Sequence, residues 1–163
     1  MVKMKYIAIL IATFLLSDNS AFCQNNLVDL NNTTILVDGL IVFNDYDLGI
    51  IYAKKTSKLI LIYFNSKLSS NCRKIEKNIF SDSKVKEYLN KKFLVINLYV
   101  DDKSFSNKSP FNTVGEYNSN IELSKFKTDL QPFLVILDSQ NKFIKSIGYI
   151  SDPKVFLKFL SEK

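Results

Sequence analysis

Histidine and tryptophan are absent from this sequence of 163 residues, and glycine, proline and cysteine are scarce, with 4, 3 and 2 residues respectively. Without histidine, the chain cannot build a histidine-based catalytic triad or most zinc and iron sites. It also lacks a glycine-rich phosphate-binding loop. The acidic pair Asp101-Asp102 offers oxygen ligands for a cation, but we interpret it as a solvated turn. We therefore predict a protein without a metal site or a cofactor.

Apolar residues are abundant, since 47% of the chain is hydrophobic and 13% is aromatic. This content supports a sizeable core, and the length favours a single domain. The formal net charge is +6, but the lysines are scattered and no dense basic tract with interleaved aromatic residues is present. Such a distribution is typical of a solvated surface, so we predict no nucleic-acid partner.

The N-terminus has the pattern of an export signal. Lys3 and Lys5 form a positive region, and the apolar run Tyr6–Leu16 that follows is too short to be a comfortable transmembrane helix. Small residues at Ala21 and Cys23 fit cleavage after Cys23. We therefore predict that residues 1–23 are a cleaved signal peptide and that the mature protein is periplasmic or secreted.

Lipidation of Cys23 is the alternative reading of the same segment. The bulky Phe22 before this cysteine disfavours it, because lipoprotein signals usually carry a small residue there. No other stretch is long and apolar enough to span a bilayer, so we predict no transmembrane segment in the mature chain. After cleavage Cys72 is the only cysteine, and the mature chain cannot form an internal disulfide.

The rest of the chain alternates between strand and helix patterns. Residues 24–44 are predicted to be an N-terminal extension with a β segment. The expected strands are Thr33–Phe43 with a turn at Asp38-Gly39, Leu59–Phe64, Phe93–Val100, Phe133–Leu137 and Phe143–Gly148. The expected helices are Asp45–Lys55, Ser69–Phe80, Ser81–Leu89, Asn120–Phe126 and one that starts at Ser151-Asp152-Pro153. A long polar loop is expected over Asp101–Ser119. This order predicts an α/β protein with a mixed central sheet flanked by helices.

The setting of Cys72 is the most informative feature of the chain. An apolar strand, a short polar turn and then a helix-like run place this thiol in the first turns of a helix. Helix N-terminal N–H groups favour an anion, and the thiolate is the reactive form of cysteine. The position three residues earlier, where a redox pair would need its second sulfur, holds Ser69.

The segment Leu61–Glu76 resembles the active-site segment of thioredoxin-family proteins. It is most similar to the periplasmic thioredoxin-like domain of the thiol:disulfide interchange proteins, in which a strand, an aromatic residue and a small turn precede Cys-x-x-Cys. Three later segments carry the same resemblance in the same order: Ile79–Val85, Phe93–Lys103 and Gln131–Phe133. The resemblance implies a thioredoxin-like fold, with the domain over residues 45–163.

The resemblance also implies roles for individual residues. Cys72 takes the place of the family's second, resolving cysteine, and Ser69 takes that of the attacking cysteine. Tyr63 stands where many members carry a buried carboxylate that assists proton transfer. Pro132 matches the family's cis-proline beside the active site. The implied substrate-binding residues are Gln131, Pro132, Ser70 and Asn71.

Two interpretations of the site remain open at this stage. In the first, the protein has an accessory role in extracytoplasmic thiol–disulfide exchange, and Cys72 forms mixed disulfides with a protein or peptide partner. In the second, it is a non-catalytic module that binds peptides or proteins around Pro132 and the loop Asp101–Ser119. In that case Cys72 is a small core residue and Ser69 is a helix N-cap. Turnover as a reductase is not expected, because that reaction needs two sulfurs.

Overall fold

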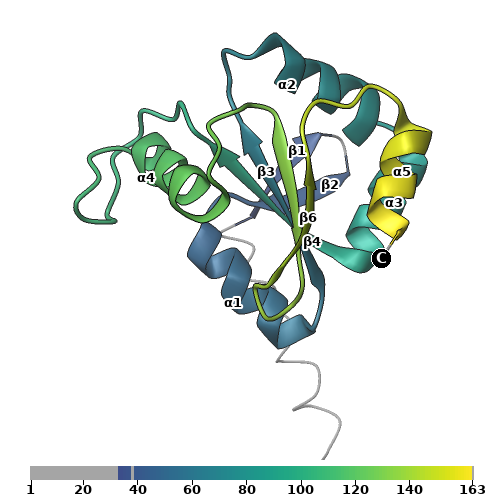
Figure 1. Cartoon of the computed structure of the whole chain (residues 1–163), viewed down its shortest axis with the longest axis horizontal. Helices are drawn as coiled ribbons and strands as arrows, with labels where there is room; N and C mark the ends of the chain where they lie inside the picture. Colours follow the sequence, from purple (N-terminus) through teal and green to yellow (C-terminus); the bar gives the residue numbers. More distant parts are fainter. Residues whose placement is uncertain (1–32, 38, 163) are drawn as a thin grey trace, which may run out of the picture. The chain divides into compact units, whose positions relative to one another are not determined.

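A computed structural model describes residues 33–37 and 39–162, which form an α/β structure around one mixed six-stranded sheet (Figure 1). The strands lie in the order β1-β2-β4-β3-β5-β6. Their bounds are β1 Thr33–Val37, β2 Leu40–Phe43, β3 Leu59–Asn65, β4 Phe93–Tyr99, β5 Phe133–Leu137 and β6 Phe143–Ile147. Strands β2, β4 and β3 are parallel, whereas β1, β5 and β6 each run antiparallel to a neighbour. The predicted fold class is confirmed, and the predicted signal peptide lies outside the described residues.

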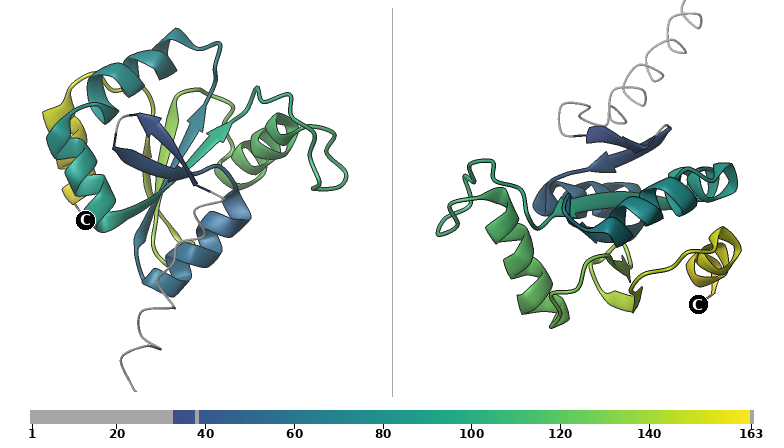
Figure 2. Two further views of the ribbon diagram at one scale, coloured as in Figure 1. Left: turned by 180° about the vertical axis from the view of Figure 1, so that it is seen from behind. Right: turned by 90° about the horizontal axis from the view of Figure 1, so that it is seen from above.

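The hairpin β1–β2 joins the N-terminal extension to the domain. Gly39 lies in its turn with a φ of 78°, a left-handed conformation that glycine adopts without steric cost. Strand β2 pairs with β4 at Phe43 and Ile96, so the extension enlarges the sheet of the domain. Figure 2 shows the hairpin at one edge of the sheet and β6 at the other.

Helices cover both faces of the sheet. The helical segments are α1 Tyr46–Thr56, α2 Ser70–Ile75, η3 Glu76–Phe80, α3 Ser83–Lys92, α4 Val114–Ile121, η4 Glu122–Phe126 and α5 Pro153–Ser161, of which η3 and η4 are π-helical turns. One core cluster packs α2, η3, α3 and α5 against one face, and a second packs α1, α4 and η4 against the other. In Figure 1, α1 and α4 accordingly lie on the opposite side of the sheet from α3 and α5.

The central strands β3 and β4 are buried on both faces. They pair in parallel over seven residue pairs, from Leu59 opposite Phe93 to Asn65 opposite Tyr99. Strand β3 is buried from its second residue to its last, and β4 from its first to its sixth. This explains why their sequences are nearly continuous apolar runs rather than alternating patterns.

The predicted loop Asp101–Ser119 is wrong at its C-terminal end, because helix α4 begins at Val114. A capping box starts this helix. Thr113 Oγ1 accepts a hydrogen bond from Glu116 N at 3.2 Å, and Glu116 Oε2 accepts one from Thr113 N at 3.2 Å. The Thr-x-x-Glu spacing is a known start signal.

Gly115 is required for close packing at the start of α4. A Cβ atom added there would lie 2.6 Å from the carbonyl oxygen of Val100 and 2.8 Å from Asp102 N, both backbone atoms that cannot rotate away. At Gly148, by contrast, the nearest atom would be 3.9 Å away.

We predict that Gly115→Ala lowers the free energy of unfolding by about 1–3 kcal/mol, the usual range for overpacking. Gly148→Ala is the control and should change stability by less than about 0.5 kcal/mol. Urea unfolding followed by circular dichroism measures both values. Equal stabilities of the two variants would contradict the close packing of α4.

Candidate functional site

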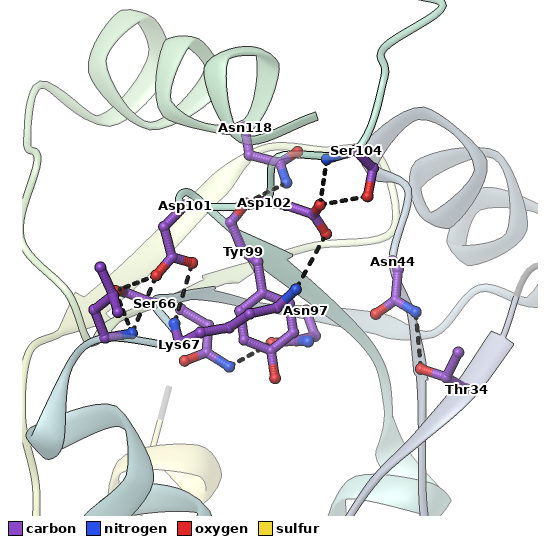
Figure 3. Close-up of polar contacts among 12 residues, drawn as sticks. Thr34, Asn44, Ser66, Lys67, Asn97, Tyr99, Asp101, Asp102, Ser104 and Asn118 are labelled. Atoms are coloured by element: carbon purple, nitrogen blue, oxygen red, sulfur yellow. Dashed lines mark hydrogen bonds and ion pairs between the residues drawn. The ribbon is translucent and has the colours of Figure 1, made fainter. Parts of the chain in front are cut away.

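A turn held by a carboxylate connects β3 to α2. Asp101, which follows β4, accepts hydrogen bonds from Ser66 Oγ at 2.8 Å, from Lys67 N at 3.1 Å and from Leu68 N at 3.1 Å (Figure 3). Partial burial alone would raise the pKa of Asp101, but these hydrogen bonds outweigh it and lower the pKa. The carboxylate therefore fixes the backbone immediately before Ser69, and Asp101 belongs to a structured turn rather than to a solvated one.

Ser69 is the N-cap of α2. Its Oγ accepts a hydrogen bond from Cys72 N at 3.3 Å, so the hydroxyl caps the helix that carries the thiol. Cys72 is fully buried and belongs to the core cluster on this face of the sheet. The side chain therefore packs as a small hydrophobic residue in this structure, with no surface open to a substrate.

Tyr63 lies beneath the first turn of α2 and is also fully buried. Its hydroxyl donates to the carbonyl oxygen of Cys72 at 3.2 Å, and its ring packs edge-on against Phe80 with centroids 5.1 Å apart. Burial raises the pKa of Tyr63 far above its ordinary value, and the neighbouring Cys72 raises it further. The residue is therefore a neutral phenol at physiological pH and cannot serve as the base that a carboxylate would provide.

Gln131 and Pro132, which precede β5, lie close to Ser69. The peptide bond between them is cis, as predicted, and Pro132 is buried. The carbonyl oxygen of Gln131 lies 3.5 Å from Ser69 Oγ, a long contact that nevertheless places the two segments side by side. Leu68 and Leu130, which flank this contact in sequence, are 84% and 67% exposed. We call the surface formed by Leu68, Ser69, Leu130 and Gln131 the docking edge.

The remaining predicted site residues lie at the start of α2. Ser70 and Asn71 are exposed, and none of the described hydrogen bonds joins them to Gln131 or Pro132. Arg73, which follows Cys72 in the chain, donates a hydrogen bond from its guanidinium to the carbonyl oxygen of Lys67 at 2.8 Å. The structure thus brings Ser69 and Gln131 together and leaves Ser70 and Asn71 on the surface.

Glu122 was not predicted from the sequence, although it contacts the docking edge. It starts η4, is 1% exposed, and accepts a hydrogen bond from Gln131 Nε2 at 2.7 Å. Its Oε1 atom is buried without a partner among the described residues. Burial raises its pKa to about 7, against the opposing effect of the Gln131 hydrogen bond, and the charge of Asp129 raises it further.

The spacing of Glu122 from two buried-face positions of the helix could have indicated from the sequence that it is buried. It lies four residues after Asn118 and one after Ile121, both buried, so the three share one face of the helical segment that starts at Val114. The expected helix began too late, at Asn120, to show this face.

A pocket of about 380 Å³ lies next to the turn that Asp101 holds, since Lys67 and Asp102 are among the residues that line it. It is lined by Thr34, Ile35, Leu36, Asn44, Lys67, Asn97, Tyr99, Asp102, Val114 and Asn118. Figure 3 shows Lys67 extended across the ring of Tyr99 towards Asp102, with an ion pair of 3.7 Å between the lysine and the aspartate. Asn97, which also lines the pocket, accepts a hydrogen bond at its Oδ1 atom from Asn65 Nδ2 at 3.1 Å, and Asn65 Nδ2 also donates to Glu76 Oε1 at 2.8 Å. Among the residues that the structure describes, no group of three or more histidine, cysteine, aspartate or glutamate side chains is placed to hold a metal.

We predict that the Cys72 thiol of the native protein lacking residues 1–23 reacts with an alkylating reagent at least ~100-fold more slowly than in denaturant, because the side chain is fully buried. Mass spectrometry at intervals after addition of the reagent measures both rates. Native labelling as fast as in denaturant would show instead that the thiol is accessible.

The second prediction concerns the pH dependence of stability. The folded protein binds the Glu122 proton more tightly than the unfolded chain does. Stability is therefore lost as the pH rises from about 4.5 towards the folded pKa of about 7, and the loss is complete above that pH. The expected loss is on the order of 2 kcal/mol. Glu122→Gln, which is neutral at every pH, should remove this decrease.

Urea unfolding at intervals between pH 4.5 and pH 8 measures this difference. The carboxylates of Asp47, Asp101 and Asp102 do not confuse the result, because their pKa values are lowered and they stay ionised throughout this range. Parallel pH profiles for the wild type and Glu122→Gln would contradict the assignment of a buried, protonated carboxyl.

Comparisons with known proteins agree with the geometry. The family model of the thioredoxin-like domain matches residues 46–163. Among solved structures, the chain is similar to a DsbH oxidoreductase, with 16% identity and a TM-score of 0.57 over 73% of this chain and 81% of that one. It is also similar to a thioredoxin from Thermus thermophilus, with 20% identity and a TM-score of 0.53 over 72% and 82%.

A third similar structure is Trxlp from Edwardsiella tarda, with 12% identity and a TM-score of 0.51 over 73% of this chain and 97% of that one. At these identities the likeness is one of fold. Comparison with curated protein sequences gives no significant match. The family match covers most of the chain, and the sheet order, the strand-to-helix turn and the cis peptide bond before Pro132 agree with it. The chain therefore belongs to the thioredoxin-like domain family.

Proposed function

We propose that this protein has an accessory role in extracytoplasmic thiol–disulfide exchange. It binds an extended segment of a thiol- or disulfide-bearing protein at the docking edge, and it does not turn over a disulfide itself. The observation that carries this proposal is the contrast between a retained edge at Ser69 and Gln131 and a thiol, Cys72, that is fully buried beside it.

The chemistry of the site argues against turnover. A dithiol reductase attacks its substrate with one sulfur and resolves the mixed disulfide with a second. The hydroxyl of Ser69 is far less acidic than a thiol, forms no disulfide and is already used as a helix cap. Tyr63 supplies no base, and Arg73 is bonded to the Lys67 carbonyl. Each group that would activate Cys72 is thus changed or engaged elsewhere.

The surface of the site supports binding. In the proposed complex, an extended segment pairs with the half-buried backbone at Gln131 through main-chain hydrogen bonds. Leu68 and Leu130, which precede Ser69 and Gln131 in the chain, are exposed, and in the proposed complex they meet apolar side chains of the bound segment. These features do not depend on a reactive sulfur.

The extracytoplasmic location is part of the proposal and is supported by the sequence pattern of residues 1–23. Within the described residues, no helix is long and apolar enough to cross a membrane. N-terminal sequencing of the protein recovered from the cell envelope or medium tests cleavage after Cys23 against lipidation of that residue.

A second candidate function is monothiol exchange by Cys72. It is favoured by the position of this residue in the first turn of α2, where backbone N–H groups stabilise a thiolate. Opening of the turn between β3 and α2 would let the Cys72 thiolate attack a partner disulfide. This attack forms a mixed disulfide and releases the partner's other sulfur as a thiolate. An external thiol such as glutathione would then displace Cys72 and take its place in the mixed disulfide. The complete burial of Cys72 argues for the first candidate over this one.

The proposal is tested with a trapping variant. Ser69→Cys combined with Cys72→Ala places one thiol at the docking edge and removes the resolving sulfur, so bound partners should accumulate as mixed disulfides. We predict that adding Leu130→Asp lowers the yield of these adducts about tenfold, because a charge replaces an exposed apolar contact. Ile51→Asp is the matched control, since Ile51 is 49% exposed on α1.

Gels run without reductant, followed by mass spectrometry of the bands, measure the adducts formed with exported proteins of the source cell. Equal yields from the Leu130→Asp and Ile51→Asp proteins would contradict docking at this edge. The single substitution Ser69→Cys checks the register: the new sulfur should form a disulfide with Cys72, and failure to bridge would show that the two positions do not match the family's cysteine pair.

A further inference from the structure

The turn at residues 127–131 that carries the docking edge has few anchors. Lys127, with a φ of 59°, ends η4 and donates its N–H to Leu123 O at 3.2 Å. Leu130 N lies 3.4 Å from Thr128 Oγ1, and the contact of Gln131 O with Ser69 Oγ is also long. The hydrogen bond from Gln131 Nε2 to the Glu122 carboxyl, at 2.7 Å, is the shortest described bond that holds this turn.

The surroundings of Glu122 do not stabilise a negative charge. None of the described ion pairs includes it, and Asp129, the charged residue that acts on it, carries the same sign. Lys125, on the same helical segment, lies over the ring of Tyr46 at 5.6 Å instead. An ionised Glu122 would thus be a buried anion with one hydrogen bond and one bare oxygen, which is costly.

The two protonation states of Glu122 therefore have different consequences for the turn. The neutral carboxyl can stay buried and accept the hydrogen bond from Gln131. The ionised carboxyl needs a donor for its buried Oε1 atom, and the turn at residues 127–131 is bonded to this carboxyl through Gln131 and has few other anchors. Glu122 also lies at the first position of a π-helical turn, a feature frequent at functional sites.

We infer that Glu122 is a positioning residue for the docking edge, which it holds closed through Gln131 when its carboxyl is protonated and releases when the carboxyl ionises. This inference rests on the proposed function for its purpose, because the edge is where the partner segment binds. It identifies a control of that binding by pH through a residue that contacts no partner itself.

Hydrogen exchange of backbone amides tests this inference directly. Peptides covering residues 123–133 are followed in the whole protein at pH 6 and pH 8, with rates corrected for the intrinsic pH dependence of exchange. In the wild type, protection should fall about tenfold between these values, since one pH unit beyond the midpoint ionises most of the carboxyl. Glu122→Gln should change less than twofold. Glu87→Gln, an exposed glutamate on α3, should behave as the wild type does.

A second measurement needs no variant. The carboxyl ¹³C resonance of Glu122 and the side-chain amide of Gln131 should titrate together with a midpoint near 7. A midpoint near the ordinary glutamate value of about 4.3, or equal loss of protection in the wild type and Glu122→Gln, would overturn the inference.

Capture by the trapping variant at pH 6 and pH 8 separates this inference from the proposed function. A pH-dependent edge without any adducts would leave the inference standing and refute docking. Adducts formed with a pH-independent edge would support docking and refute the role of Glu122. Adduct yields that change with pH only while Glu122 is present would support both.

Discussion

The parallel pairing of β3 with β4 is the constraint on which the rest of this structure depends. Both strands are buried on both faces, and their seven-pair register brings their carboxyl ends to the same level. The turn after β3 therefore meets the chain that leaves β4, and Asp101 can accept three hydrogen bonds from Ser66, Lys67 and Leu68. A shift of one residue in this register would separate the carboxylate from the turn and exchange the side chains that each strand directs into the two core clusters.

In the proposed function, the site keeps the backbone of a thioredoxin-like active site while its chemistry differs. Ser69 keeps the capping role and the contact with Gln131, both of which a hydroxyl performs well. Tyr63 fills its buried position with a ring packed on Phe80 and donates a hydrogen bond to the Cys72 carbonyl oxygen. Ser69 and Tyr63 satisfy the local hydrogen bonding and core packing without supplying a second sulfur or a base. The docking that we propose requires only this backbone geometry and no reactive sulfur.

The residues at and around the docking edge come from both layers of helices. Cys72 and Tyr63 belong to the core on one face of the sheet, whereas Glu122 lies on η4, which packs on the other face. The docking edge receives Ser69 from the first layer and is held through Gln131 from the second. In the proposed mechanism, a proton on Glu122 therefore acts on this edge from the face of the sheet opposite to the thiol.

The sequence by itself determined most of the helices and strands. The apolar run of β3, the capping serine before Cys72 and the proline at the start of α5 act over a few residues, so local patterns were enough to predict them. The start of α4 was equally local, since Thr113 and Glu116 form a capping box, and it was missed only because polar residues and Gly115 made the segment look like a loop.

Tertiary structure alone decided how the site residues are exposed and paired. The burial of Cys72, the clamp from Asp101 to Ser66 and the bond from Gln131 to Glu122 join residues up to 35 positions apart in the chain. The exposure of a side chain and the pKa of a carboxyl depend on which other elements pack over them. The helix and strand periodicities of the sequence do not contain that information. The sequence therefore identified the thiol, and only the packing of α2 against the sheet showed that it is sealed in the core.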